Sequence, residues 1–181
     1  MTHFGNRALS FCLFALSPLL AASVQSDCRS CEPFGLQRYP NNKEAPPFTL
    51  RSMGGTQVAL DQLKGKPVLL FFWGTWCEAC KEDIVLLEKF AEGKKDQLSI
   101  YTVLVDGERE RRGRDIVSKL KITLPVLLVT KEKVLDNYEI RMIPSAYFID
   151  RDGFLVGRIL GQRDWCTPAA WSATKELLSL P

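Results

Sequence analysis

Two cysteines separated by two residues, Cys77 and Cys80, are the residues of this sequence whose type and spacing most directly indicate chemistry. They end the stretch FFWGTWCEAC. A thiolate is the nucleophile of disulfide exchange, and a second thiol one helical turn away can attack the resulting mixed disulfide. A purely structural disulfide is disfavoured, because closing so short a loop removes little entropy from the unfolded chain. The pair therefore predicts redox chemistry, with Cys77 attacking and Cys80 resolving.

The elements around the pair are predicted to position it. Residues 67–73, PVLLFFW, form an uninterrupted apolar run that is typical of a central strand buried on both faces. Apolar residues at helical spacing follow over residues 84–91, and Gly93 is the expected end of that helix. Cys77 then lies at the helix N-terminus, where unpaired backbone N–H groups and the helix dipole stabilise a thiolate.

The rest of the chain alternates between strand and helix patterns. The elements predicted after the central helix are a strand over 98–105, a helix over 113–120, a strand over 125–129, a short helix over 131–138, a hairpin over 145–160, and a last helix that begins at Pro168 with Thr167 as N-cap. A hairpin around Gly54 and Gly55 precedes the central strand. This order predicts an α/β fold, a mixed central β-sheet flanked by helices with an added N-terminal hairpin.

Length and composition predict one globular domain preceded by a targeting segment. The 181 residues include 46% apolar and 25% charged residues, and the net charge of +3 is too small to indicate nucleic-acid binding. Residues 1–26 have one arginine, an apolar run and then small residues, the pattern of a signal peptide or, less favoured, an uncleaved membrane anchor. Cleavage after Ser23 and after Ser26 fit equally well. We expect an extended cysteine-containing lead-in over 27–45 and a folded domain over 46–181.

Export changes the interpretation of the remaining cysteines, because disulfides persist in oxidising compartments. Cys12 lies in the targeting segment, and the five cysteines outside it cannot all be paired. A zinc site built from two CxxC pairs is disfavoured, because the second pair is fixed at a strand-to-helix junction and oxidation competes for the thiols. His3, the single histidine, lies in the targeting segment. We therefore expect no metal and no cofactor.

Cys28, Cys31 and Cys166 leave their pairing open. The favoured hypothesis is structural: Cys166 pairs with Cys28 or Cys31 and tethers the lead-in to the domain, which leaves one thiol free. In the alternative, the CRSC segment forms its own disulfide or a second redox relay, and Cys166 is buried and inert.

These motifs resemble the TlpA-like and ResA-like branch of exported thioredoxin-fold thiol:disulfide oxidoreductases. FFWGTWCEACKED is similar to the W-x-x-W-C-x-x-C segment of that family, and YEIRMIPSAYFIDRDG to its second signature, a proline before a strand and an Asp-Gly hairpin. The resemblance covers residues 45–180. It implies that Cys77 attacks, that Cys80 resolves, and that Pro144 is a cis-proline whose peptide group with Ile143 binds an extended substrate chain. Trp76, beside the pair, is a further substrate-binding candidate.

Departures from the family pattern identify residues that could tune the thiols. Phe71 stands where general thioredoxins have a buried aspartate, and Asp83 stands where ResA-like proteins have an acidic residue. Glu78 lies between the cysteines and is a second candidate. A nearby carboxylate raises the pKa of a thiol by disfavouring a second negative charge. Trp73 and Trp76 are expected to shield the pair on one side.

The resemblance implies a reductase at the periplasmic or outer face of the cytoplasmic membrane. Its clients would be proteins with cysteine pairs, such as apocytochrome c or copper-site proteins, and a membrane thiol transporter would donate electrons. The alternatives are a disulfide-donating oxidase, a non-enzymatic client-binding module and a thiol peroxidase. Peroxiredoxins require a proline and a threonine where this chain has Leu70 and Gly74.

Overall fold

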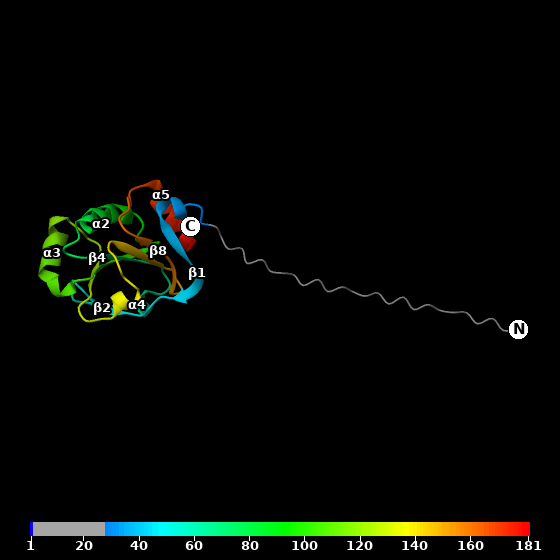
Figure 1. Cartoon of the computed structure of the whole chain (residues 1–181), viewed down its shortest axis with the longest axis horizontal. Helices are drawn as coiled ribbons and strands as arrows, with labels where there is room; N and C mark the ends of the chain where they lie inside the picture. The colour runs from blue at the N-terminus through cyan, green and yellow to red at the C-terminus, as the bar shows by residue number, and fades with distance from the viewer. Residues whose placement is uncertain (2–27) are drawn as a thin grey trace.

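The structure, a computed structural model, describes Met1 and residues 28–181. The targeting segment predicted over residues 1–26 therefore lies outside the described residues, Met1 excepted. In the described part, one sheet crosses the molecule and helices lie on both of its faces (Figure 1). The α/β architecture predicted from the sequence is confirmed.

The sheet contains eight strands in the order β1-β8-β7-β4-β5-β6-β2-β3. Their bounds are β1 Leu36–Glu44, β2 Thr49–Ser52, β3 Gln57–Ala59, β4 Val68–Trp73, β5 Ser99–Leu104, β6 Val126–Leu128, β7 Ser145–Ile149 and β8 Phe154–Leu160. Strands β4, β5 and β6 run parallel to one another, and every other neighbouring pair is antiparallel. The sheet is therefore mixed and contains an added N-terminal hairpin, as predicted. This β2–β3 hairpin lies beside β6.

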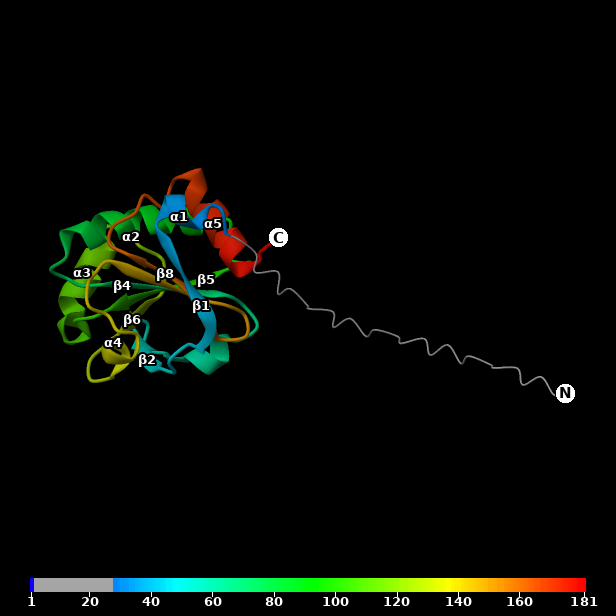
Figure 2. The same cartoon turned by 45° about the vertical axis from the view of Figure 1, so that its right-hand side comes forward.

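Helices cover the two faces of the sheet unequally (Figure 2). Their bounds are α1 Cys31–Phe34, α2 Glu78–Ala91, α3 Glu110–Lys119, α4 Val134–Asn137 and α5 Pro168–Leu178, with 3-10 turns at Leu60–Leu63 and Gly107–Arg109. Apolar residues of α1, α2, α3 and α5 pack into one core layer, whereas α4 and the first 3-10 turn contribute to the layer on the opposite face.

Strand β4 is the centre of both core layers. All six of its residues are buried, and because side chains alternate along a strand, its odd-numbered residues pack under α2 and α5 while its even-numbered residues face α4. The uninterrupted apolar run at residues 67–73 is explained by this burial on both faces. Trp73 is completely buried, so the expectation that it shields the cysteines from outside was wrong, whereas Trp76 is 60% exposed.

The lead-in predicted over residues 27–45 contains regular structure that the sequence pattern did not show. It forms α1 and the edge strand β1, which pairs with β8. The ladder shifts register between Arg38 and Lys43, and Pro40 lies inside the shifted stretch. Such an interruption removes the alternation by which a strand is recognised.

The last helix begins where the sequence predicted, with Pro168 first and Thr167 at the N-cap position. The side chain of Thr167 does not cap the helix, however, because its hydroxyl donates to the backbone carbonyl of Asp164 at 3.0 Å. This bond belongs to the loop between β8 and α5, which also contacts helix α2.

Candidate active site

Cys77 is the N-cap residue of the fourteen-residue helix α2, and it follows the buried strand β4 after a three-residue loop. Its Sγ accepts the backbone N–H of Cys80 at 3.1 Å, and the two cysteines form a disulfide. The residue exposure is 7% for Cys77 and 0% for Cys80. An N-cap sulfur that already accepts an N–H bond is placed to be stabilised as a thiolate.

The loop before Cys77 is held by a contact that sequence reasoning missed. Thr75 is completely buried, and both its backbone N–H and its hydroxyl donate to the carboxylate of Asp106, at 3.0 and 2.5 Å. Asp106 follows β5, the parallel neighbour of β4. The signal was an aspartate close behind a strand adjacent to the catalytic strand, because the carboxyl ends of parallel strands share one sheet edge.

The structure places the predicted substrate-binding residues at the end of β4, where the loop that leads to Cys77 begins. The Ile143–Pro144 peptide bond is cis, as predicted, and β7 begins directly after it, with Ser145 paired to Phe72 of β4. Pro144 therefore lies across from the end of β4. Trp76 and Ile143 line the same surface depression, which has a volume of about 170 Å³.

Trp76 and Met142, the latter also lining this depression, are 60% and 49% exposed. Large apolar side chains exposed together are typical of a contact surface. An extended chain lying beside the disulfide could cover them.

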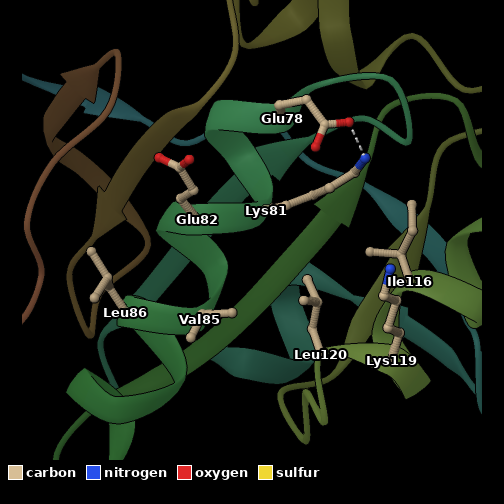
Figure 3. A pocket seen from close by; sticks show the side chains of 8 residues that line it. All are labelled: Glu78, Lys81, Glu82, Val85, Leu86, Ile116, Lys119 and Leu120. Carbon is tan, nitrogen blue, oxygen red and sulfur yellow. Dashed lines mark hydrogen bonds and ion pairs between the residues drawn. The ribbon is translucent and has the colours of Figure 1, made fainter.

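The two tuning candidates differ completely in their surroundings. The side chain of Glu78 is 81% exposed and pairs with Lys81, whose hydrogen bond lowers the pKa of Glu78 (Figure 3). Glu78 lies at the rim of a groove of about 540 Å³ between α2 and α3. Asp83, in contrast, is 1% exposed. Since it follows Cys80 by three residues in α2, it lies on the same side of the helix as the resolving sulfur.

Asp83 is held from the loop between β8 and α5. Its two carboxylate oxygens accept the backbone N–H of Arg163 at 3.2 and 3.1 Å. Burial raises the pKa of Asp83 from 3.8 to about 6, although the N–H of Arg163, the indole of Trp165 and the Arg163 guanidinium oppose the rise. The indole N–H of Trp165 has no partner at hydrogen-bonding geometry among the described residues, so its effect on Asp83 is one of proximity. Asp83 can therefore take up a proton near neutral pH.

The chain has relatives with named activities. The model of the AhpC/TSA family matches residues 42–158. The thiol-disulfide oxidoreductase ResA of Bacillus subtilis is 32% identical over 128 residues, which cover 70% of this chain and 71% of that protein. ResA of Bacillus cereus is 32% identical over 122 residues, or 67% of this chain and 70% of the relative.

The chain belongs to the ResA-like thiol-disulfide oxidoreductases of the AhpC/TSA family. The thioredoxin domain of a thiol-disulfide oxidoreductase from Bacteroides vulgatus superimposes with a TM-score of 0.66 at 26% identity, covering 77% of this chain and 99% of that domain. The fold is therefore the thioredoxin fold, and the protein is a thiol:disulfide oxidoreductase.

The cysteines outside the CEAC segment of this ResA-like protein do not form the pair that the favoured hypothesis predicted. Cys28 and Cys31 form a disulfide with each other, and Cys166 is free and exposed. The predicted tether through Cys166 was therefore wrong. The alternative, in which the CRSC segment forms its own disulfide, is confirmed in its pairing, but its expectation that Cys166 is buried was wrong. The Cys166 Sγ lies 3.9 Å from the carbonyl oxygen of Leu86, on the α2 side of its loop.

Two observations on residues 28–181 concern metals and membranes. No group of three or more His, Cys, Asp or Glu side chains in this part of the chain could hold a metal ion. In the same range, no helix has the length and apolar character needed to span a bilayer.

Proposed function

We propose that the protein reduces disulfides of client proteins through Cys77 and Cys80. The observation that carries this proposal is the placement of the pair: Cys77 is the N-cap of α2 beside an exposed apolar surface, and Cys80 is completely buried behind it. Such an arrangement suits one outer, attacking sulfur and one inner sulfur that reacts only within the protein.

The proposed reaction has two exchanges. The Cys77 thiolate attacks one sulfur of the client disulfide, a mixed disulfide forms, and the other client sulfur leaves as a thiolate. Cys80 then loses its proton and attacks the Cys77 Sγ, which closes the Cys77–Cys80 disulfide and releases the client dithiol. Two electrons pass from the protein to the client. Cys77 and Cys80 end as a disulfide, and the client cysteines end as two thiols.

Asp83 is the proposed acceptor of the Cys80 proton. It lies on the same side of α2, and its pKa of about 6 is higher than that of an ordinary carboxyl because it is buried. Once ionised, the buried carboxylate also disfavours a thiolate at Cys80. Destabilising the reduced, thiolate-bearing state favours the disulfide form of the enzyme, so Asp83 supports reduction of clients.

Trp76, Ile143 and Pro144 are the proposed client-binding residues. The client would lie extended across the depression that Trp76 and Ile143 share. Clients are proposed to be proteins with cysteine pairs, among them apocytochrome c or copper-site proteins, and a membrane thiol donor would re-reduce Cys77 and Cys80. Export, with residues 1–26 as signal or anchor and residues 46–181 as the thioredoxin-like domain, is part of the same proposal. The Cys28–Cys31 disulfide supports an oxidising compartment.

A peroxidase function finds no support at the site. Strand β4 carries Leu70 at the position where peroxiredoxins have proline, and Gly74 takes the place of their threonine. A peroxide-consumption assay distinguishes the two activities.

The reduction potential of the Cys77–Cys80 pair tests the proposed direction. Equilibration with dithiothreitol or glutathione buffers is expected to give a value near or below that of thioredoxin, roughly −270 mV. A value near that of a strong oxidant, about −120 mV, would overturn the reductase proposal and indicate a disulfide donor.

Client trapping tests the assigned roles. The Cys80→Ser variant keeps the attacking sulfur and should accumulate mixed disulfides with clients through Cys77. A non-enzymatic binding module would form none, and the Cys77→Ser variant is the matched control that should trap nothing.

A further inference from the structure

The disulfide between Cys28 and Cys31 lies at the start of α1 and takes no part in the proposed reaction. It joins residues only three positions apart. Because the loop is so short, the bond restricts the unfolded chain much less than a long-range disulfide does. Stabilisation of the fold is therefore a weak explanation for it.

The segment that carries the disulfide is also attached to the domain by other contacts. The backbone N–H and hydroxyl of Ser30 donate to the carboxylate of Glu176 on α5, at 3.1 and 2.7 Å. Arg163 Nε donates to the carbonyl of Phe34 at 3.0 Å, and the Phe34 ring packs edge-on against Trp165 at 5.4 Å. These contacts do not involve the sulfur atoms, so α1 can stay docked when the disulfide opens.

The two sulfurs differ in accessibility. Cys31 is 3% exposed and packs in the core layer under α5, whereas Cys28 is only partly buried. The exposed cation Arg29 directly follows Cys28. A neighbouring cation lowers the pKa of a thiol and attracts an incoming thiolate. Glu176, which accepts from Ser30, also interacts with the charge of Arg29, and this attraction helps to lower the pKa of Glu176. The effect of the cation on Cys28 is therefore expected to be small.

We infer that Cys28–Cys31 is a second thiol–disulfide exchange site, which accepts electrons from an external protein dithiol. One thiolate of the partner attacks the Cys28 Sγ, the Cys28–Cys31 bond breaks, and Cys31 leaves as a thiolate that takes up a proton. The second thiol of the partner then loses its proton and attacks the partner's first sulfur, the one bonded to Cys28. The mixed disulfide breaks, and Cys28 is released as a thiolate that takes up a proton. The partner ends as a disulfide, and Cys28 and Cys31 end as two thiols.

The short loop makes this exchange reversible. After reduction, the contacts of Ser30 and Phe34 keep the two thiols within one turn of each other, so an oxidant can close the bond again without refolding of the chain. This property is shared with the catalytic pair, which is also separated by three positions.

The first test uses the full wild-type chain. It is equilibrated with dithiothreitol, and separately with reduced thioredoxin, and free thiols are then alkylated and assigned by peptide mass mapping. Mapping resolves Cys28 and Cys31 from Cys77 and Cys80, so the result does not depend on the catalytic role of the second pair. We expect both Cys28 and Cys31 to be alkylated while circular dichroism stays native. In a parallel sample that is reoxidised before the alkylating reagent is added, we expect neither cysteine to be labelled. Labelling that appears only in denaturant would overturn the inference.

The second test uses two matched variants, Cys31→Ser and Cys28→Ser, exposed to glutathione disulfide. In the first, the Cys28 thiolate attacks glutathione disulfide, forms a mixed disulfide and releases one glutathione thiolate. We expect this adduct at Cys28 and its loss in the second variant, where only the buried Cys31 remains of the pair. Equal modification of both cysteines, or of neither, contradicts the proposed access route.

Discussion

The two disulfides of this protein have the same spacing and the same Cα–Cα distance, 5.3 Å, yet they lie in very different surroundings. Cys77–Cys80 follows a fully buried strand and begins a fourteen-residue helix. Cys28–Cys31 begins a four-residue helix near the sheet edge. A CxxC spacing thus places two sulfurs within bonding distance, while the adjoining helices and strands decide which molecules can reach them.

Charge separates the two sites further. The catalytic pair has the buried carboxyl of Asp83 behind it, whereas the second pair has the exposed cation Arg29 between its cysteines. A carboxylate disfavours a thiolate and a cation favours one. The nearest charges thus differ in sign at the two places, although Glu176 offsets part of the charge of Arg29.

Removal of the attacking sulfur should separate the two sites most strongly. Cys77→Ser is expected to abolish reduction of client disulfides, because the sulfur that remains in the first turn of α2, that of Cys80, is completely buried. Cys28→Ser should leave that activity largely intact, and Cys166→Ser serves as the cysteine-removal control. An insulin-reduction or client-reduction assay measures the effect. Equal loss in Cys77→Ser and Cys28→Ser would show that the two pairs act as one relay.

Asp83→Asn should stabilise the oxidised protein at pH 7, by up to about 3 kcal/mol for a pKa raised from 3.8 to about 6. Between pH 3.8 and about 6 the folded state holds a proton on Asp83 that the unfolded state has released, and above that range the folded state has to bury the charged carboxylate. Wild-type stability is therefore full below pH 3.8 and falls as the pH rises through 6. Urea unfolding at pH 3.5 and pH 7 measures the difference between variant and wild type.

The control for this prediction is Glu78→Gln. Because Glu78 is exposed and paired with Lys81 at the surface, its replacement should not show a stability gain that grows with pH. A gain for Asp83→Asn that is equal at both pH values would show that burial of the charge is not the cause.

Thr75→Val should destabilise the fold by about 1–3 kcal/mol, because the buried carboxylate of Asp106 loses the hydroxyl donor. It should also lower the rate of client reduction, since the loop before Cys77 loses one of its two anchors. Thr75→Ser retains the hydroxyl and is the matched control. Thermal or urea unfolding beside the activity assay tests both effects, and an unchanged Thr75→Val protein would remove this anchor from the explanation.

Arg29→Gln is expected to have the smallest effect, a few-fold slower opening of Cys28–Cys31 by dithiothreitol. Arg151→Gln removes one exposed positive charge from the β7–β8 turn and is the control for net charge. Raising the salt concentration should reduce the difference between them, because exposed charges are screened. Identical rates for both variants would assign no role to Arg29.

Local patterns in the sequence were sufficient to predict the catalytic strand and helix. Burial determines the apolar pattern of a strand or helix, and this pattern can be read within the element itself. Both the run at residues 67–73 and the spacing over residues 84–91 are of this kind. Strand β1 was missed because its ladder is interrupted where Pro40 stands. An interrupted ladder leaves no period to detect.

Features that depend on tertiary contact were not predictable. Thr75 and Asp106 are 31 positions apart and meet through the parallel pairing of β4 and β5. The pairing of Cys28 and Cys31, with Cys166 left free, depends on where α1 docks. Glu78 and Asp83 remained alternatives because the contact that holds Asp83 comes from Arg163, 80 positions along the chain.

The sheet ends at β1 on one side and β3 on the other, and neither end is a good template for another strand. Strand β1 has an irregular ladder, a proline and exposed charged residues, and β3 has three residues. Edges of this kind resist edge-to-edge association. An oxidoreductase that holds unfolded client segments beside its sheet risks co-aggregating with them. Because both sheet edges disfavour pairing with another strand, a client chain is expected to bind at the exposed apolar surface beside Cys77 instead.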